Sequence, residues 1–288
     1  MGLVNAQKHW RTRVKYRIAV VAAAALSVAA CSRSGEDPSA FQWSNELPAG
    51  AVVHLRDGAG DIVVKRSEGQ SVQVSGSRRW RRGHASDIKF VVNQVGNDYY
   101  VCAMWQGSGK CGSNGYRGRQ TNGLLTMFSL FHRSSDASAD FTAEIPANVV
   151  VDAKTSNGSV HVDGMSAGVT AHTTNGTIQA SNVSGPLALS TTNGDVRLST
   201  DALSDADAVS LTTTNGTIRA ELPPKFEGAF DLSVVNGTVR TDLPLASSGK
   251  GRPGRHFQGQ IGTSTRVVKM RAVNGNVSVV TRAVPATQ

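Results

Sequence analysis

The most regular feature of this chain is an alternation of apolar and polar positions around repeated Asn-Gly pairs. Apolar residues or Thr lie two, four and six positions before each Asn, and an apolar residue lies two positions after each Gly. The positions between them are mostly polar. Since successive side chains of a β-strand point to opposite faces, this pattern predicts strands with one buried face. Six pairs carry it: Asn157-Gly158, Asn175-Gly176, Asn193-Gly194, Asn215-Gly216, Asn236-Gly237 and Asn274-Gly275.

The spacing of these pairs predicts how the strands assemble. The first three pairs are 18 residues apart, and the later gaps are 22, 21 and 38 residues. A repeat of this length is typical of stacked rungs that bury their apolar faces against each other. We therefore predict an all-β fold, a right-handed β-solenoid (β-helix-like) of Asn-Gly rungs.

An array of β-hairpins is the alternative, because Asn-Gly between alternating strands is also typical of a type I′ turn. Both arrangements keep the apolar positions on one face, so the alternation does not separate them. Aligned copies place Thr over Thr and Asn over Asn. Such columns are what stacked rungs produce, and they favour the solenoid.

The repeat region resembles a known family. The segment from Phe141 to Val280 contains TAEIPANVVVDAKTSNGSVHVDG and repeated TTNG units, and it resembles the bacterial DUF4097 family of proposed adhesins. Residues 53–64, VHLRDGAGDIVV, are similar to the family's opening rung. The resemblance implies a β-helix-like repeat protein of the cell envelope with an adhesin-like role.

Residues 1–30 have the pattern of a signal peptide. The apolar run Ile18–Val28 is shorter than the ~20 residues that cross a bilayer. Val28-Ala29-Ala30-Cys31 resembles the bacterial lipobox, which implies that Cys31 is the lipidated first residue of the mature protein; the alternative is an ordinary secretory signal with an incidental Cys. Ser32 after it, by resemblance to Gram-negative lipoproteins, favours the outer membrane. Five bases precede the apolar run: Lys8, Arg11, Arg13, Lys15 and Arg17.

The rest of the chain divides into a linker and one domain. Residues 31–50 are polar and contain Pro, which predicts a tether. Residues 51–284 form the predicted solenoid domain. Two segments rich in Gly, 106–135 and 243–260, are predicted loop excursions. Within the first, Leu124, Phe128 and Phe131 have helical spacing and predict an amphipathic helix that caps an open end of the solenoid.

Charge and cysteine content narrow the function. The formal charge is +9, but without the five leader bases 25 bases face 21 acids, a net charge of +4, and nucleic-acid binding is not expected. Cys102 and Cys111 are nine residues apart, and in an oxidising envelope this spacing predicts a disulfide. No His or Cys cluster lies near enough in sequence to complete a metal site, and no cofactor is expected.

Two sets of basic residues are candidate binding sites. Arg78, Arg79, Arg81 and Arg82 surround Trp80 and could bind phosphates or the carboxylates of an acidic saccharide; a solvated strand edge is the alternative. Arg197, Arg219 and Arg240 each lie three positions after a repeat Gly. Stacked rungs would place them about 4.8 Å apart, a column suited to acidic polysaccharide or lipopolysaccharide. Glu221 and Asp242 lie close enough in sequence to neutralise that column.

The sequence predicts a binding protein and no enzyme. The outward acids Asp163, Asp195, Glu221 and Asp242 form no pair of the kind that glycoside hydrolysis needs. We predict an exported, lipid-anchored envelope module, at the outer membrane, that binds anionic glycans. A structural or regulatory periplasmic module that binds another envelope protein is the alternative, and a polysaccharide-acting β-helix enzyme is the third reading.

Overall fold

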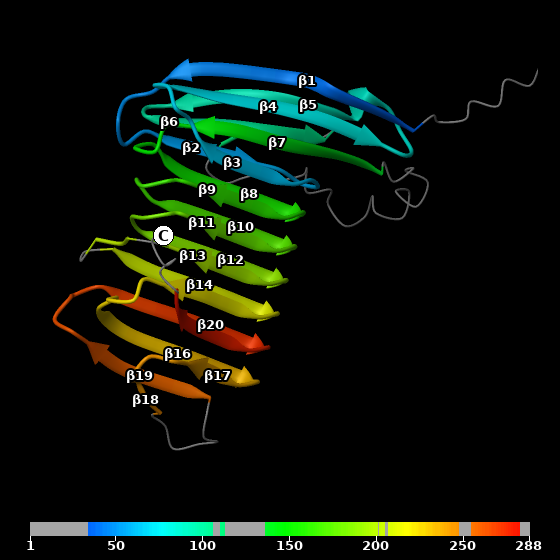
Figure 1. The fold of residues 1–288 in the computed structure, drawn as a ribbon. Coiled ribbons are helices and arrows are strands. Elements are labelled where there is room, and N and C mark those ends of the chain that lie inside the picture. The colour runs from blue at the N-terminus through cyan, green and yellow to red at the C-terminus, as the bar shows by residue number, and fades with distance from the viewer. Residues whose placement is uncertain are drawn as a thin grey trace, which may run out of the picture. The chain divides into compact units, whose positions relative to one another are not determined.

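Two long β-sheets make up most of the structure, a computed structural model that describes residues 34–105, 110–112, 136–200, 202–204, 207–247 and 255–282 (Figure 1). Within these residues the only helix is the short 3₁₀ helix η1, Ala85–Asp87. Apolar side chains from both sheets form one buried core, which includes Leu55, Phe141 and Leu189. The all-β prediction is confirmed.

Sheet A has ten strands, in the spatial order β1 (Gly35–Glu46), β4 (Ser71–Trp80), β7 (Ala137–Ile145), β3 (Ile62–Arg66), β9 (Val160–Asp163), β11 (Ile178–Ser181), β13 (Val196–Ser199), β15 (Ile218–Leu222), β21 (Val277–Thr281) and β17 (Val239–Thr241). Sheet B has eleven strands, in the order β18 (Ala246–Ser247), β19 (His256–Ile261), β16 (Gly228–Asn236), β20 (Val267–Asn274), β14 (Ala208–Asn215), β12 (Leu187–Asn193), β10 (Val169–Asn175), β8 (Val150–Asn157), β2 (Val52–Arg56), β6 (Asp98–Trp105) and β5 (Ile88–Val95).

Each Asn-Gly pair lies at a corner between the two sheets. Asn157-Gly158, for example, connects β8 of sheet B to β9 of sheet A, and these two strands do not pair with each other. Instead β8 pairs in parallel with β10, and Asn157 lies opposite Asn175. The hairpin alternative is therefore wrong for these corners, and the solenoid-like stacking is confirmed.

A ladder of side-chain amides connects the corners. The Asn175 amide donates to the Asn157 oxygen at 2.7 Å, and Asn193 donates to Asn175 at 2.8 Å. The ladder continues through Asn215 and Asn274 to Asn236. Because each amide both donates and accepts, every interior Asn of the ladder has its polar atoms paired in register with its neighbours.

Glycine at the corners is required by the close approach of successive rungs. A Cβ atom on Gly176 would overlap the carbonyl oxygen of Gly158, and one on Gly194 would overlap that of Gly176. Two Thr hydroxyls donate to these same carbonyls, from Thr173 to Gly158 at 2.8 Å and from Thr191 to Gly176 at 3.0 Å. The inward Thr column is therefore satisfied within the core, as buried hydroxyls must be.

The order of the rungs in space differs from their order in sequence. The last rung, β20 and β21, lies between the β14–β15 rung and the β16–β17 rung (Figure 1). The opening rung, β2 and β3, similarly lies between β8–β9 and β6–β7. At both ends of the stack, therefore, a rung from elsewhere in the sequence lies between two rungs that are consecutive in the chain.

The predicted tether over residues 31–50 is wrong for residues 35–46. They form β1, which pairs antiparallel with β4 along the edge of sheet A. Most of its side chains are exposed, it contains Pro38, and its register shifts between Asp37 and Phe41. Edge strands tolerate Pro and irregular pairing because one side makes no ladder hydrogen bonds.

Parts of the two predicted excursions lie within the described residues. In the second, Ala246–Ser247 and His256–Ile261 are strands β18 and β19, so the prediction of a loop over 243–260 is wrong for residues 246–247 and 256–260. The signal segment 1–30, the lipobox Cys31 and the predicted capping helix over 121–133 lie outside the described residues. No helix within the described part of the chain is long and apolar enough to cross a bilayer.

Candidate functional site

The cluster from Arg78 to Arg82 is placed at the end of β4, where it meets the start of β1 and β7. Arg78 is turned inward: its guanidinium donates to the carbonyl oxygens of Ala85 at 2.7 Å and Ile88 at 3.0 Å, and it pairs with Asp37 at 3.2 Å. This residue holds the η1 turn against β4. It is a structural residue, and the binding role predicted for it has no support in these contacts.

The remaining arginines of this cluster are closer to solvent. Arg79 pairs with Asp140 at 2.6 Å, and Arg82 lies 3.8 Å from Asp136. Arg81 is exposed, and no carboxylate within the described residues pairs with its side chain. Of the four candidate binding arginines, Arg78 and Arg79 are thus held by close carboxylates, which leaves Arg81 and the loosely paired Arg82.

An open hollow of about 800 Å³ lies beside these residues. The half-buried indole of Trp80 forms part of its wall. The other lining residues are Ser34, Gly35, Glu36, Arg79, Arg81, Asp136 and Ser138. The wall therefore combines an aromatic surface with both signs of charge.

The second predicted set forms a row across the outward face of sheet A. Arg197 on β13 lies opposite Arg219 on β15, as predicted. Arg240 does not follow directly, because β21 lies between β15 and β17 and places Ser278 between Arg219 and Arg240. The predicted column of three arginines is therefore wrong: two are adjacent, and the third is two strands away from Arg219.

On the other side of Arg197 the row continues with polar groups. Gln179 lies opposite Arg197, and His161 lies opposite Gln179. Strand neighbours are about 4.8 Å apart, so the row presents four polar side chains at a regular interval. A shallow pocket of about 140 Å³ lies on it, lined by Gln179, Ala180, Ser181, Arg197, Leu198, Ser199, Arg219 and Glu221.

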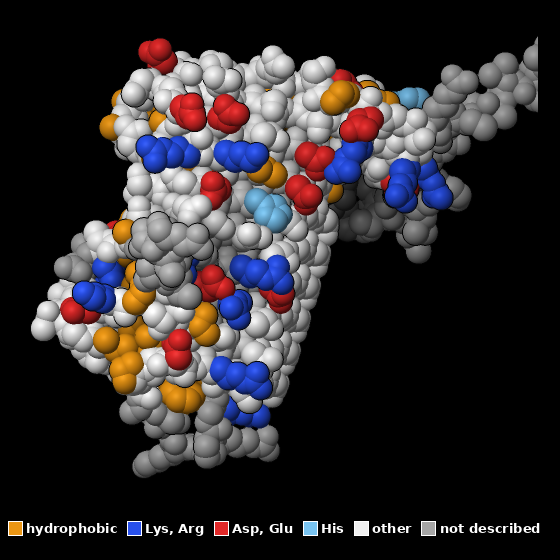
Figure 2. Space-filling model, in the orientation of Figure 1, with side chains coloured by type: hydrophobic (Ala, Val, Ile, Leu, Met, Phe, Trp, Pro, Cys, Tyr) orange, Lys and Arg blue, Asp and Glu red, His pale blue; other side chains and the backbone are white. Residues whose placement is uncertain are grey.

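A carboxylate two residues away in the sequence pairs with each arginine of this row. Arg197 donates to Asp195 at 2.9 Å, and Arg219 donates to Glu221 at 3.0 Å, as was predicted for Glu221. Asp242, the second predicted partner, instead accepts from the Thr281 backbone at 2.9 Å. Figure 2 shows basic and acidic side chains interleaved over the visible face, so no broad basic patch lies there.

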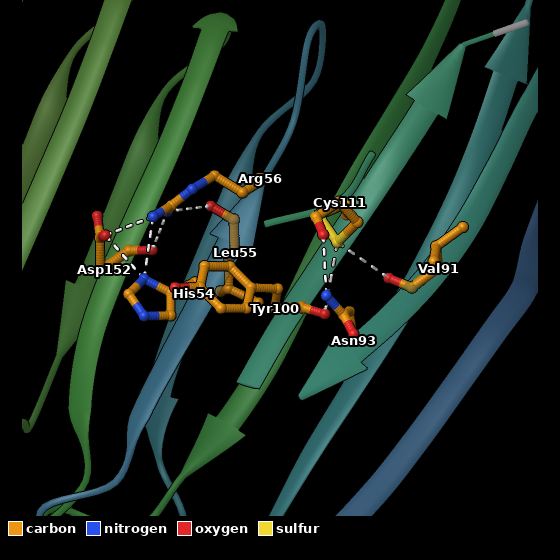
Figure 3. The surroundings of a disulfide bond; sticks show 9 residues. His54, Leu55, Arg56, Val91, Asn93, Tyr100, Cys111 and Asp152 are labelled. Carbon is orange, nitrogen blue, oxygen red and sulfur yellow. Dashed lines mark hydrogen bonds and ion pairs between the residues drawn. A yellow bond between two sulfur atoms is a disulfide. The ribbon is translucent and has the colours of Figure 1, made fainter. Parts of the chain in front are cut away.

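The predicted disulfide between Cys102 and Cys111 is confirmed, with 5.9 Å between the two Cα atoms. It fastens the residues around position 111 to the outward face of β6 and β5, where the Asn93 amide donates to the Cys111 carbonyl at 3.1 Å (Figure 3). Tyr100 and both cysteines form a small second cluster of buried residues.

Sequence reasoning missed a buried polar cluster next to this disulfide. Arg56, only 3% exposed, donates to the backbone oxygen of Asp152 at 2.6 Å and also pairs with its carboxylate (Figure 3). His54 lies 2.9 Å from the same carboxylate and stacks on Tyr100, with ring centroids 4.2 Å apart. Burial raises the pKa of Asp152, but hydrogen bonds from His54 and Arg56, together with the charge of Arg56, outweigh it and hold the pKa below its usual range.

This cluster holds the opening rung in place. His54 and Arg56 lie on β2 and Asp152 lies on β8, so the ion pair connects residues that are about a hundred positions apart in the sequence. The sequence contains one indication of this cluster: His54 and Arg56 alternate with the inward residues of the opening rung, so both lie on its outward face. The cluster links neighbouring rungs and contains no nucleophile beside the imidazole, so we assign it to the structure.

Asp57 is a second buried carboxyl that the sequence did not reveal. Burial raises its pKa to about 8, although the backbone N–H groups of Ala59 and Gly58 favour the charged form. Its Oδ1 accepts from Gly58 at 2.7 Å, whereas Oδ2 has no hydrogen-bond partner. Asp57 occupies the column position that Thr155 holds in the next rung, and its carboxyl stabilises the opening corner.

The described residues contain no group of three or more His, Cys, Asp or Glu side chains placed to hold a metal ion. The outward acids named above are engaged in local contacts: Asp163, for instance, accepts from Asn182 at 2.8 Å. Among the residues described, these acids therefore form no assembled set of catalytic groups.

A family model described as Toastrack DUF4097 matches residues 132–280, which is more than half of the chain. This chain belongs to the DUF4097 family. The matched region begins just before β7 and ends within β21, so it includes every Asn-Gly corner and the whole Arg197–Arg219 row. The predicted family is confirmed.

Solved structures offer two further comparisons for this DUF4097 chain. One is a proposed cell adhesion protein from Clostridium sporogenes, with 12% identity and a TM-score of 0.48, covering 87% of this chain and 100% of the other. Another is a proposed adhesin from Bacteroides fragilis, with 9% identity and a TM-score of 0.36, covering 83% of this chain and 96% of the other. No curated protein matches the sequence.

Proposed function

We propose that this DUF4097 protein is an exported, lipid-anchored, non-enzymatic binding module of the cell envelope, and that its ligand is an acidic glycan that lies along the outward row of sheet A. The N-terminal sequence supports the export and lipid anchoring at Cys31, and Ser32 supports an outer-membrane address. For the winding of the rungs we expect the right-handed sense, which parallel crossover connections strongly prefer.

The observation that carries the glycan proposal is the pocket on the row from His161 to Arg219. Arg197 and Arg219 are adjacent and in register, and the side chain of each is 52% exposed. Asp195 and Glu221 pair with these guanidiniums, but such exposed ion pairs contribute only about 0–1 kcal/mol. The guanidiniums therefore keep donor groups for a carboxylate or phosphate of a ligand.

The geometry favours an extended ligand over a compact one. The row runs across the strands, and its polar groups recur at the strand spacing of about 4.8 Å. The pocket on it, about 140 Å³, is large enough for one charged substituent and too small for a whole oligosaccharide. A polymer lying along the row would place a substituent there and use Gln179 and His161 for further contacts.

The full-length protein tests this proposal. Its affinity for a polyuronate should exceed that for a neutral glucan, and the double variant Arg197→Gln/Arg219→Gln should bind the polyuronate about tenfold more weakly. Lys269→Gln/Arg271→Gln, which removes two charges from the outward face of sheet B, is the matched control and should bind normally. Equal binding by all three proteins would contradict the proposal.

A protein partner is the second candidate, and exposed valines favour it. Val235 on β16 is 56% exposed, and Val273 on the neighbouring β20 is 40% exposed. Their strands pair in register on either side of these positions, so the two side chains lie next to each other on sheet B. If Val235→Ser/Val273→Ser abolishes co-purification of one envelope protein while glycan binding is absent, this second function is supported.

A further inference from the structure

We infer that Arg79, Trp80, Arg81 and Arg82 form a membrane-docking surface that lies on phospholipid headgroups beside the lipid anchor. The inference rests on the proposed lipidation of Cys31, and it deepens that proposal by giving the basic-aromatic cluster a ligand. The glycan row on sheet A is a separate surface and takes no part in it.

The length of chain between the anchor and the domain carries the argument. Strand β1 begins at Gly35, so only residues 32–34 separate it from Cys31. Four Cα-to-Cα steps span at most about 14 Å, even when fully extended. Gly35 is paired with Trp80 in the β1–β4 ladder. A lipidated Cys31 would therefore keep Trp80 within a short distance of the bilayer surface, whatever the orientation of the rest of the domain.

The side chains at this end suit a bilayer interface. Trp80 is half-buried and lines the open hollow, and Trp is enriched at the headgroup level of membranes. The side chains of Arg79 and Arg82 are 52% and 75% exposed. Arginine can keep its apolar stem on the protein or lipid surface while its guanidinium binds phosphate in bidentate fashion. The cluster thus combines the two residue types that anchor proteins at this depth.

Neighbouring acids determine which arginines are available to bind lipid phosphate. Asp140 holds Arg79 at 2.6 Å, so Arg79 serves mainly to position the strand end. The 3.8 Å between Arg82 and Asp136 is longer than a hydrogen bond, and Arg81 has no carboxylate partner among the described residues. Arg81 and Arg82 are therefore the phosphate-binding pair. Glu36 and Asp136 oppose an anionic surface, so the contact should be weak alone and effective only when the anchor supplies a high local concentration.

The full chain tests this inference after expression with its own leader and reconstitution into vesicles. The vesicles contain phosphatidylethanolamine and phosphatidylglycerol, with bromine atoms placed on the acyl chains near the headgroups. Mass analysis of the N-terminal peptide first establishes whether Cys31 carries lipid. Brominated lipid should then quench tryptophan emission, and Trp80→Phe should remove about half or more of that quenching. Trp43→Phe, on the strand paired with β4, is the matched control and should leave most of it.

A second variant changes only charged side chains, so the test does not depend on whether Trp80→Phe folds. Arg81→Gln/Arg82→Gln should reduce the quenching of Trp80, whereas Arg197→Gln/Arg219→Gln should not. If Cys31 carries lipid and neither Trp80→Phe nor the Arg81/Arg82 variant changes the quenching, the inference is overturned and the anchor stands. If Cys31 carries no lipid, both the anchor and the docking surface are overturned.

Discussion

A Cβ atom on Gly194 would overlap the carbonyl oxygen of Gly176 in the neighbouring rung. The same relationship recurs from Gly158 to Gly275, so the glycines set how closely the corners stack. The Asn ladder and the Thr hydroxyls can form only at that separation. The repeat is therefore specified by three columns that depend on each other: Gly for approach, Asn for the ladder and Thr for the buried carbonyls.

Replacing Gly194 should destabilise the fold even with the smallest side chain. Gly194→Ala forces the Cβ atom against the Gly176 carbonyl and strains a residue with a φ of 153°. We expect a loss of about 1–3 kcal/mol in the free energy of unfolding. Gly69→Ala is the control, because the nearest atom to a Cβ there is 3.8 Å away. Urea denaturation compares the two; equal stability of both variants would refute the packing argument.

The Asn ladder makes a smaller and separable contribution. Asn193→Ala removes the amide that donates to Asn175 at 2.8 Å and accepts from Asn215 at 2.7 Å. These groups are exposed, so we expect a cost of about 0.5–1.5 kcal/mol. Thr192→Ala, at an adjacent position outside the ladder, should be close to neutral. Thermal melts that rank Thr192→Ala as the more harmful change would contradict the role given to the ladder.

The sequence was sufficient to predict these columns because they are local and periodic. Residues at fixed distances from each Asn-Gly pair reach the same place in every rung, so alignment of the copies predicts their stacking. It could not predict that the last rung enters between the β14–β15 and β16–β17 rungs. That insertion depends on strand pairing between residues that are far apart in the chain, and it placed Ser278 between Arg219 and Arg240.

Two other features could not be read from the sequence for similar reasons. Strand β1 is mostly exposed and irregular, so it lacks the alternation that marks a half-buried strand. The cluster of His54, Arg56 and Asp152 joins strands that are distant in the chain. Phase placed these side chains on the outward face, but only the three-dimensional structure shows that they are buried next to the disulfide.

Asp57 should make stability depend on pH. Its pKa is raised from 3.8 to about 8 in the folded chain, so between these values the folded state binds a proton that the unfolded state has lost. Stability from this group is therefore full below about pH 4 and falls as the pH rises towards 8. Asp57→Asn keeps the acceptor for Gly58 and removes the titration. It should be more stable than wild type at pH 8, by roughly 1–3 kcal/mol, and similar at pH 4.

Denaturant titrations of Asp57→Asn and wild type at both pH values check this expectation. Glu68→Gln, which removes an exposed carboxylate that is not among the causes of the raised Asp57 pKa, is the control for the loss of a surface charge. A constant difference between Asp57→Asn and wild type across the range would show that Asp57 is charged in the folded protein.

Asp152 should make stability depend on pH in the opposite direction. Its pKa is lowered, so its stabilising effect is present above about pH 4 and is lost as the pH falls below that value. Asp152→Asn leaves the guanidinium of Arg56 buried without its carboxylate, which should cost roughly 3–5 kcal/mol at neutral pH. Asp163→Asn, an exposed acid on β9, should cost under about 0.5 kcal/mol. The gap between Asp152→Asn and wild type should narrow in acid; a gap that widens in acid would argue against this assignment.

The proposed binding role depends on the row from His161 to Arg219, and a hydrogen-exchange footprint tests it most directly. The full-length protein is compared with and without a polyuronate, with a neutral glucan as control. We predict slower amide exchange over Ile178–Ser181, Val196–Ser199 and Ile218–Leu222 with the polyuronate alone, and loss of that protection in Arg197→Gln/Arg219→Gln. Slower exchange confined to sheet B, or no change in exchange at all, would contradict the proposed binding role.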